Sequence, residues 1–214
     1  MPKFIDCTQG SAEWLQARVG RITGSRMSDV MAYLKSGKGE MACRRDYRMD
    51  LMAERLTGSA EKKVVTAEMQ WGIDHELEAK GAYEVAMDCL IQTVGFAVHP
   101  SMDYSGASPD GLLDADGILE VKCPKTTTHL SYLMAGTVPE DYQPQMLWEM
   151  ACCERTWGHF VSYDPRLPED MRLLIIRFDL DGKRVAAMED EVGKFNLEIE
   201  AALESLKTRG MVAA

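Results

Sequence analysis

The segment from residue 105 to residue 123 constrains the fold of this chain more than any other. Two short, mostly apolar runs, Ser105–Leu113 and Ile118–Cys123, are joined by the sequence Asp-Ala-Asp-Gly. Aspartate and glycine tolerate the positive φ angles of a tight turn, so the pattern predicts a β-hairpin. Asp110, Glu120 and Lys122 interrupt the two runs. Charges placed among core strand residues are usually paired or functional, so these three are candidate site residues.

Glu120 and Lys122 are two positions apart, so in a strand both side chains point to the same face. A turn at 114–117 would fold Asp110 back beside them. Two carboxylates and an amine at one sheet edge offer hard oxygen ligands, which suit Mg²⁺ or Mn²⁺ rather than zinc. The alternative is a surface hairpin with a solvated Glu–Lys pair, because the same acid-x-Lys triplet also begins at Glu61, Glu78 and Asp181.

Hydrophobic periodicity predicts the remaining elements. The N-terminal part reads as helices: one capped by Ser11, one capped by Ser25, one from Tyr47 to Gly58, and one over 68–88. Strands are expected at 91–98, 157–163 and 172–178, and further helices at 127–135, 143–154 and 184–207. This order predicts an α/β domain with a mixed central β-sheet flanked by helices and a helical N-terminal part.

Two of these elements carry finer expectations. The strand at 172–178 is nearly all apolar, which is typical of a buried central strand. The helix over 68–88 has an apolar stripe at every fourth position, which should face the core and would place Glu76 at its border. The stripe consists of Met69, Ile73, Leu77, Gly81 and Val85.

The charge balance argues against binding nucleic acid by bulk charge alone. The 214 residues include 24 Lys and Arg against 34 Asp and Glu, a formal net charge of −10. A local basic path remains compatible with this balance, because residues 1–60 hold ten basic and seven acidic side chains. The six cysteines form no CxxC pair, which predicts neither a zinc site nor disulfides. No signal peptide and no membrane helix is recognised, so we expect a cytoplasmic protein.

Several ordered blocks carry a family resemblance. Pro109-Asp110 followed by Glu120-Val121-Lys122 resembles the PD-(D/E)xK nuclease motif. The chain around it is similar to the phage lambda exonuclease and YqaJ-like viral recombinase family of that superfamily. The other blocks are Gln9-Gly10 to Ser25, Trp71-Gly72 with Glu76, Gln143-Pro144-Gln145, and Tyr163-Asp164-Pro165-Arg166. Together they span roughly residues 9–166, and the resemblance implies a restriction-endonuclease-like core.

The resemblance also implies a two-metal site for hydrolysis of phosphodiesters. Asp110 would bridge two Mg²⁺ ions, for which Mn²⁺ can substitute. Glu120 and the backbone carbonyl of Val121 would complete the protein ligands of the first ion. Lys122 would orient or deprotonate the attacking water, whose pKa a metal lowers. Glu76 would hold a metal-bound water, unless it only pairs with Lys80 one helical turn away.

Further residues acquire roles by the same resemblance. Arg18 would grip a terminal 5′ phosphate, since a guanidinium contacts phosphate in a bidentate manner, and Ser25 would add a hydroxyl. Gln145 would donate to the active-site phosphate or to a metal-bound water. Lys35 and Lys38 would form a basic loop along the DNA. The alternative for Arg18 is an exposed helix-end cation, and for Ser25 a plain helix cap. The alternative for Gln145 is a polar helix position, and for Lys35 and Lys38 a solvated loop.

The implied protein is a single nuclease domain, with a DNA-end-binding part at 1–60, a catalytic core at 61–180 and a C-terminal helix at 181–214. It would be a Mg²⁺-dependent 5′-to-3′ exonuclease that processively digests double-stranded DNA and leaves a 3′ overhang for recombination. The resemblance adds a ring-shaped homotrimer, a single-strand annealing protein as partner, and a phage or prophage origin. The alternatives are an endonuclease or resolvase on the same core, or a non-catalytic DNA-binding protein.

Overall fold

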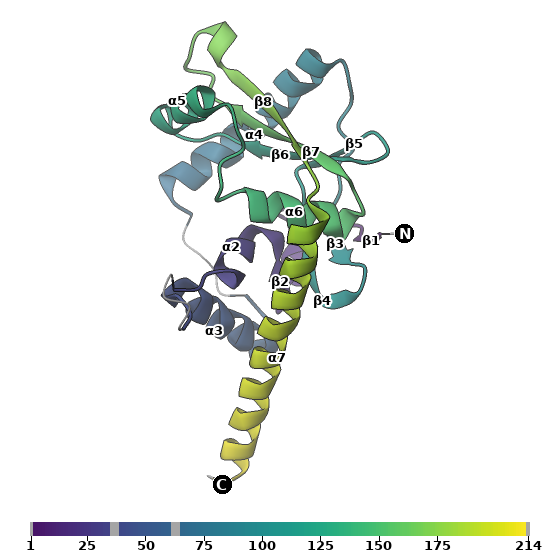
Figure 1. The fold of residues 1–214 in the computed structure, drawn as a ribbon, viewed down its shortest axis with the longest axis vertical. Coiled ribbons are helices and arrows are strands. Elements are labelled where there is room, and N and C mark those ends of the chain that lie inside the picture. The colour runs from purple at the N-terminus through teal and green to yellow at the C-terminus, as the bar shows by residue number, and fades with distance from the viewer. Residues whose placement is uncertain (1, 35–38, 61–64, 213–214) are drawn as a thin grey trace.

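The computed structural model describes residues 2–34, 39–60 and 65–212 (Figure 1). The first half of the chain contains β1 (Lys3–Ile5), α1 (Ala12–Arg18), β2 (Ile22–Thr23), the 3₁₀ turn η1 (Gly24–Arg26), α2 (Met27–Val30), α3 (Ala42–Thr57), α4 (Ala67–Met87), β3 (Phe96–His99) and β4 (Met102–Ala107). The second half contains β5 (Gly111–Leu113), β6 (Gly117–Lys122), α5 (Thr126–Ala135), α6 (Gln143–Cys153), β7 (Trp157–Tyr163), η2 (Glu169–Met171), β8 (Leu173–Asp179) and α7 (Gly182–Val212).

The mixed α/β architecture is confirmed, but the strands form two sheets. One has the order β1-β3-β4-β2 and the other β5-β6-β7-β8, and each contains one parallel pair. The strand expected at 105–113 is therefore divided at residues 108–110. Pro109 has no backbone N–H to donate to a ladder, and the N–H of Asp110 already bonds the carbonyl of Leu119 in the second sheet. The chain thus changes sheets at the Pro-Asp turn.

Helix α6 lies between the two sheets and joins their cores (Figure 1). It contacts β3 and β4 on one side and β6 and β7 on the other. Leu147, Trp148 and Met150 are fully buried there. The middle of the helix is apolar nearly all round, as a helix that is covered on both sides requires. Pro144 stands in its first turn, as expected from the sequence.

The predicted burial of α4 is wrong. Met69, Ile73, Leu77 and Val85 are exposed, with Leu77 at 81% and Val85 at 85%. The helix packs on β6, β7 and β8 through the opposite face, where Ala79 and Tyr83 are buried. Apolar periodicity identifies an apolar face of a helix. It does not show whether the chain's own core or another molecule covers that face. Glu76 stands between the apolar stripe and the covered face, because it is three residues from both Ile73 and Ala79.

Two smaller expectations are also corrected. β8 is an edge strand of its sheet, and it is half-buried because both of its faces are only partly covered. Ser25 does not cap a helix: it lies within η1, and α2 begins at Met27 without a side-chain cap. By contrast, Ser11 accepts a hydrogen bond from the N–H of Trp14, and Gly58 ends α3 with φ of 69°. Within the described ranges, no helix is both long and apolar enough to span a bilayer.

Candidate active site

The β5–β6 hairpin brings the predicted carboxylates together at the point where the chain changes sheets. Oδ2 of Asp110 accepts a hydrogen bond of 2.7 Å from the backbone N–H of Val121 on β6. The N–H and the C=O of one strand residue point to the same side, so the Val121 carbonyl lies on the Asp110 side of β6. Burial and the charge of Glu120 raise the pKa of Asp110 to about 7, against the opposing charge of Lys122.

Glu120 is 1% exposed and is held through only one of its two carboxylate oxygens. Its Oε1 accepts from Nζ of Lys122 and, at 2.6 Å, from Nε2 of Gln145 on α6. Its Oε2 is buried and meets no hydrogen-bond donor among the described residues. A buried carboxylate oxygen without a partner is costly, and a bound cation would remove that cost.

The donor set fits a divalent cation. It comprises Oε2 of Glu120, the Asp110 carboxylate and the Val121 carbonyl, all hard oxygens. In the parts of the chain that the structure describes, no group of three His, Cys, Asp or Glu side chains converges as a complete ligand set. The backbone carbonyl and water therefore have to supply the remaining ligands.

Lys122 lies beside both carboxylates. Burial lowers its pKa, but the charges of Glu120 and Asp110 and the hydrogen bond to Glu120 outweigh burial, so the pKa is raised. The ammonium also lies 5.2 Å from the ring centroid of Tyr142, within range of a cation–π contact. In the metal-free protein these interactions favour the ammonium form of Lys122.

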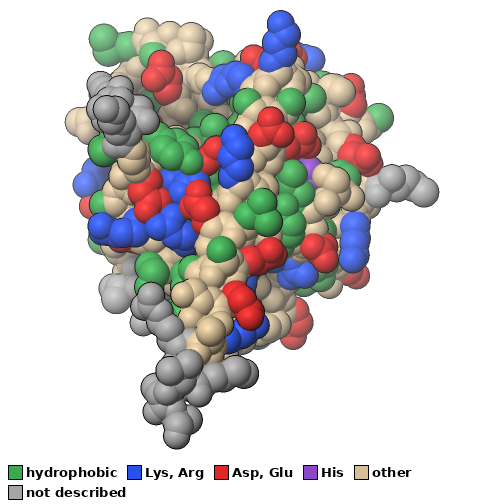
Figure 2. Space-filling model, turned by 60° about the horizontal axis from the view of Figure 1, so that its bottom comes forward, with side chains coloured by type: hydrophobic (Ala, Val, Ile, Leu, Met, Phe, Trp, Pro, Cys, Tyr) green, Lys and Arg blue, Asp and Glu red, His purple; other side chains and the backbone are tan. Residues whose placement is uncertain are grey.

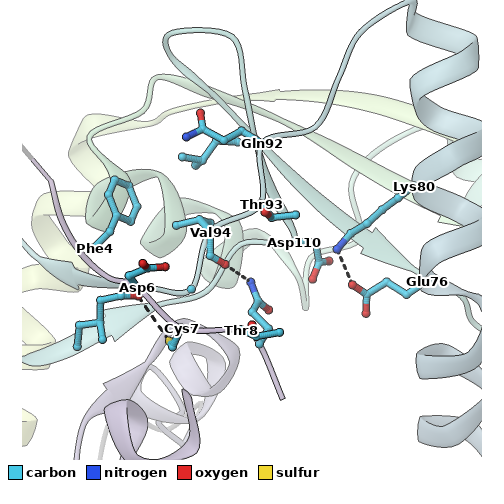
Figure 3. A pocket seen from close by; sticks show the side chains of 14 residues that line it. Phe4, Asp6, Cys7, Thr8, Glu76, Lys80, Gln92, Thr93, Val94 and Asp110 are labelled. Carbon is cyan, nitrogen blue, oxygen red and sulfur yellow. Dashed lines mark hydrogen bonds and ion pairs between the residues drawn. The ribbon is translucent and has the colours of Figure 1, made fainter. Parts of the chain in front are cut away.

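Glu76 and Lys80 of α4 face the same cavity as Asp110 (Figure 3). The cavity encloses about 600 Å³ between α4, β1 and the segment before β3. Nζ of Lys80 pairs with Oε1 of Glu76 at 2.6 Å, so the ion pair that the sequence offered as an alternative does form. It forms in the lining of this cavity, and the charges of both residues act on Asp110.

A second group of residues lies next to the Pro-Asp turn. Nη2 of Arg18 donates to Oγ of Ser25 at 3.2 Å, and its guanidinium lies 4.3 Å from the ring of Trp14. Nε1 of Trp14 donates to Oγ of Ser108 at 2.9 Å, two residues before Asp110. Burial lowers the pKa of Arg18. Among the described residues no carboxylate forms an ion pair with it, so the guanidinium keeps donors free for an anion.

The other basic residues of the N-terminal part are mostly neutralised. Arg44 and Arg48 pair with Glu40 and Glu198, and Arg26 pairs with Asp29. Figure 2, which views the molecule from the end where α7 projects, shows basic and acidic side chains side by side. Lys35 and Lys38 lie outside the described residues. The charge excess of residues 1–60 thus does not by itself make a continuous basic surface.

Further contacts connect the blocks that carried the family resemblance. Nε2 of Gln9 donates to the carbonyl of Pro109 at 2.8 Å and to that of Val94 at 2.9 Å, which ties the N-terminal segment to the catalytic turn. The guanidinium of Arg166 lies 4.1 Å from the ring of Trp71 on α4. Asp164, which is fully buried, holds Arg166 in place through an ion pair.

Sequence reasoning missed Glu149 of α6. It is 1% exposed, accepts a hydrogen bond from Gln145 at 2.8 Å, and lies close enough to Glu120 for their charges to interact. Burial raises its pKa, and the charge of Glu120 adds to that rise. A signal was present, because Glu149 is the only charge in the otherwise apolar run Met146–Cys153.

A sequence profile of the YqaJ-like viral recombinase domain matches residues 13–156. The site and the fold define an enzyme of the metal-dependent nuclease class. The chain belongs to the YqaJ-like viral recombinase family. No curated protein sequence matches it significantly.

Solved structures agree with this assignment. The alkaline exonuclease LHK-Exo from Laribacter hongkongensis is 39% identical with a TM-score of 0.88, and its complex with dAMP gives 0.89. Each comparison covers 95% of this chain and 100% of the other. A phage-related exonuclease from Haemophilus somnus 129PT is 12% identical over 87% of this chain and 96% of its own, with a TM-score of 0.67, and shares the fold.

Proposed function

We propose that this nuclease is a Mg²⁺-dependent exonuclease that digests double-stranded DNA from a 5′-phosphorylated end and leaves a 3′ single strand. One observation supports the polarity: the guanidinium of Arg18, which forms no ion pair with a carboxylate among the described residues, is coupled through Trp14 and Ser108 to the turn that bears Asp110. An anion bound at Arg18 and Ser25 would therefore lie near the metal ligands. A guanidinium beside a hydroxyl suits a phosphate group, and we assign the terminal 5′ phosphate to it.

Asp110, Glu120 and the Val121 carbonyl would hold two Mg²⁺ ions, with Asp110 shared. Bound metal ions of this kind activate water and stabilise the leaving oxygen of an in-line displacement. Lys122, which pairs with Glu120, would orient or deprotonate the attacking water and offset charge on the scissile phosphate. Glu76, at the mouth of the cavity, would act on the metal site through water.

Gln145 has a narrower role than a direct contact with phosphate. Both hydrogens of its Nε2 are engaged, one by Glu120 and one by Glu149. Its amide nitrogen therefore orients the carboxylate of Glu120, and only its oxygen is left to accept a hydrogen bond from water.

The exposed apolar stripe on α4 supports assembly into several copies. Leu77 and Val85 are more than four-fifths exposed on one helix face, together with Ile73 and Met69. Rows of exposed apolar side chains mark protein–protein contacts. We infer a ring-shaped homotrimer that encloses DNA and acts processively. A single-strand annealing protein would bind the 3′ strand, in the cytoplasm of a bacterial cell that carries a phage or prophage.

A linear duplex labelled at each end tests the proposal. With Mg²⁺ we expect loss of the 5′ label as mononucleotide from phosphorylated ends, slower attack on 5′-hydroxyl ends, and no digestion in EDTA. First shortening of the 3′ end would overturn the polarity. Equal cleavage of covalently closed circles would favour an endonuclease instead.

A further inference from the structure

Gln145 and Glu149 stand one turn apart on α6 and form a relay to the metal site. Nε2 of Gln145 donates to Oε1 of Glu120 at 2.6 Å and to Oε1 of Glu149 at 2.8 Å. Two acceptors thus determine how the amide is turned, because the flipped amide would set its oxygen against two carboxyl groups. Glu149 therefore restricts a side chain that in turn restricts Glu120.

Packing alone does not account for a glutamate at this position. Glu149 is 1% exposed, and its Oε2 meets no hydrogen-bond partner in the described part of the chain. A buried carboxyl with an unpartnered oxygen is costly, and an apolar side chain of similar length would fill the same space without that cost. Its neighbours Trp148 and Met150 are fully buried. The polar group is thus an exception within its own helix.

The surroundings of Glu149 place it between the two halves of the site. A Cβ at Gly24 would lie 3.7 Å from Cγ of Glu149, so the side-chain stem runs beneath the turn that carries Ser25. The charge of Glu149 also acts on Arg18. On the other side it reaches Glu120 through Gln145. The Glu149 side chain therefore lies between the Arg18–Ser25 group and the metal ligands: it bonds Gln145 directly, and its charge acts on Arg18 and Glu120.

We propose that Glu149 is a positioning residue of this nuclease: it accepts a hydrogen bond from Gln145 and so holds Glu120 with Oε2 turned toward the metal. The inference rests on the proposed function and deepens it by adding a residue that touches neither substrate nor metal. Residues behind a metal ligand commonly change metal affinity or activity by about 10- to 100-fold. We expect the same range here.

The test compares Glu149→Met with Glu149→Gln in the full chain. Methionine has similar length and no acceptor oxygen, so Mn²⁺ affinity measured by calorimetry should fall about tenfold or more and kcat should fall with it. Glutamine keeps the carbonyl oxygen that Gln145 needs, so its Mn²⁺ affinity should stay within about threefold of wild type. Met150→Leu is the control for disturbed packing of α6, and thermal unfolding checks that each variant is folded.

Wild-type Mn²⁺ affinity in a folded Glu149→Met protein would overturn the inference, as would equal losses in the methionine and glutamine variants. If Glu149→Met does not fold, Gln145→Leu takes its place. The relay then predicts a comparable loss of Mn²⁺ affinity, and unchanged affinity would refute it. Failure of the proposed function would look different: the wild-type protein would bind Mn²⁺ but would not digest DNA ends. The Mn²⁺ affinities of the Glu149 variants would still test the positioning role in that case.

Discussion

Oδ2 of Asp110 lies 2.7 Å from the backbone nitrogen of Val121 and accepts its hydrogen bond. Together with the hydrogen bond from the N–H of Asp110 to the carbonyl of Leu119, this contact joins the turn before β5 to β6. It fixes the Asp110 carboxylate beside the strand that carries Glu120, and it leaves the second carboxylate oxygen for a ligand. The same hydrogen bond therefore positions a site residue and attaches the start of the hairpin to β6.

Asp110→Asn should separate these two functions. The amide oxygen of asparagine can still accept from Val121, and the substitution removes a buried carboxylate whose pKa is raised, so we expect the melting temperature at neutral pH to be no lower than that of wild type. Activity on linear duplex should fall at least ~1,000-fold, because a neutral amide is a poor ligand for Mg²⁺ and the loss of several kcal/mol of charge stabilisation corresponds to that factor. Asp114→Asn, on the exposed turn of the same hairpin, is the matched control. Substantial activity in Asp110→Asn would remove Asp110 from the catalytic set.

Metal affinity should depend on pH through Asp110. Its pKa is raised to about 7 in the metal-free protein, so below that pH the carboxyl carries a proton that a cation must displace. Apparent Mg²⁺ affinity should fall by up to about tenfold per pH unit below 7 and level off above it. Calorimetry from pH 5.5 to 8.5 checks this, and a flat profile would contradict it.

Asp110 also makes the stability of the metal-free fold depend on pH, but stability falls as pH rises whereas metal affinity increases. The folded-state pKa is about 7 and the ordinary value is 3.8, so between these values the folded state binds more protons than the unfolded state. The contribution of Asp110 to stability is therefore lost as pH rises from about 4 to 7. Asp110→Asn should remove this part of the pH dependence of thermal unfolding.

Arg18→Lys should weaken recognition of the DNA end without changing the chemistry. An ammonium cannot make the bidentate contact of a guanidinium, so KM for 5′-phosphorylated duplex should rise about tenfold, as expected for a loss near 1.4 kcal/mol. KM for 5′-hydroxyl duplex should change little. Arg45→Lys, at an exposed position on α3, is the control. Equal effects on both kinds of end would show that Arg18 does not read the phosphate.

The hairpin and its three charged residues were predictable because their signals are local. The two apolar runs, the Asp-Gly turn and the spacing of Glu120 and Lys122 all operate within twenty residues. The approach of Glu149 to Glu120 was not predictable from the sequence, because it depends on how α6 packs between the two sheets. The hydrogen bond between Arg18 and Ser25 likewise depends on η1, a turn that replaces the helix start that Ser25 suggested.

The outer face of α4 shows the other limit of sequence reasoning. The helix and its apolar stripe form as the sequence predicts, but the prediction that this stripe faces the core is wrong, because the chain covers the opposite side of the helix. Ala79 and Tyr83 pack on the sheet, while Leu77 and Val85 face outward. A pattern of this kind does not distinguish a core from an interface between copies. The assembly state of the protein therefore decides what the stripe means.

Leu77→Glu and Val85→Glu should dissociate the proposed homotrimer. Both side chains are more than four-fifths exposed in a single copy, so a charge there should change monomer stability by no more than about 0.5 kcal/mol. In an interface the same charge would be buried without a partner, which opposes association. Light scattering should then give a trimer for wild type and a monomer for the variants, and digestion of long duplex should become distributive. Leu197→Glu, at an exposed apolar position on α7, is the control. A wild-type monomer, or variants that keep the wild-type mass, would show that this face does not hold the copies together.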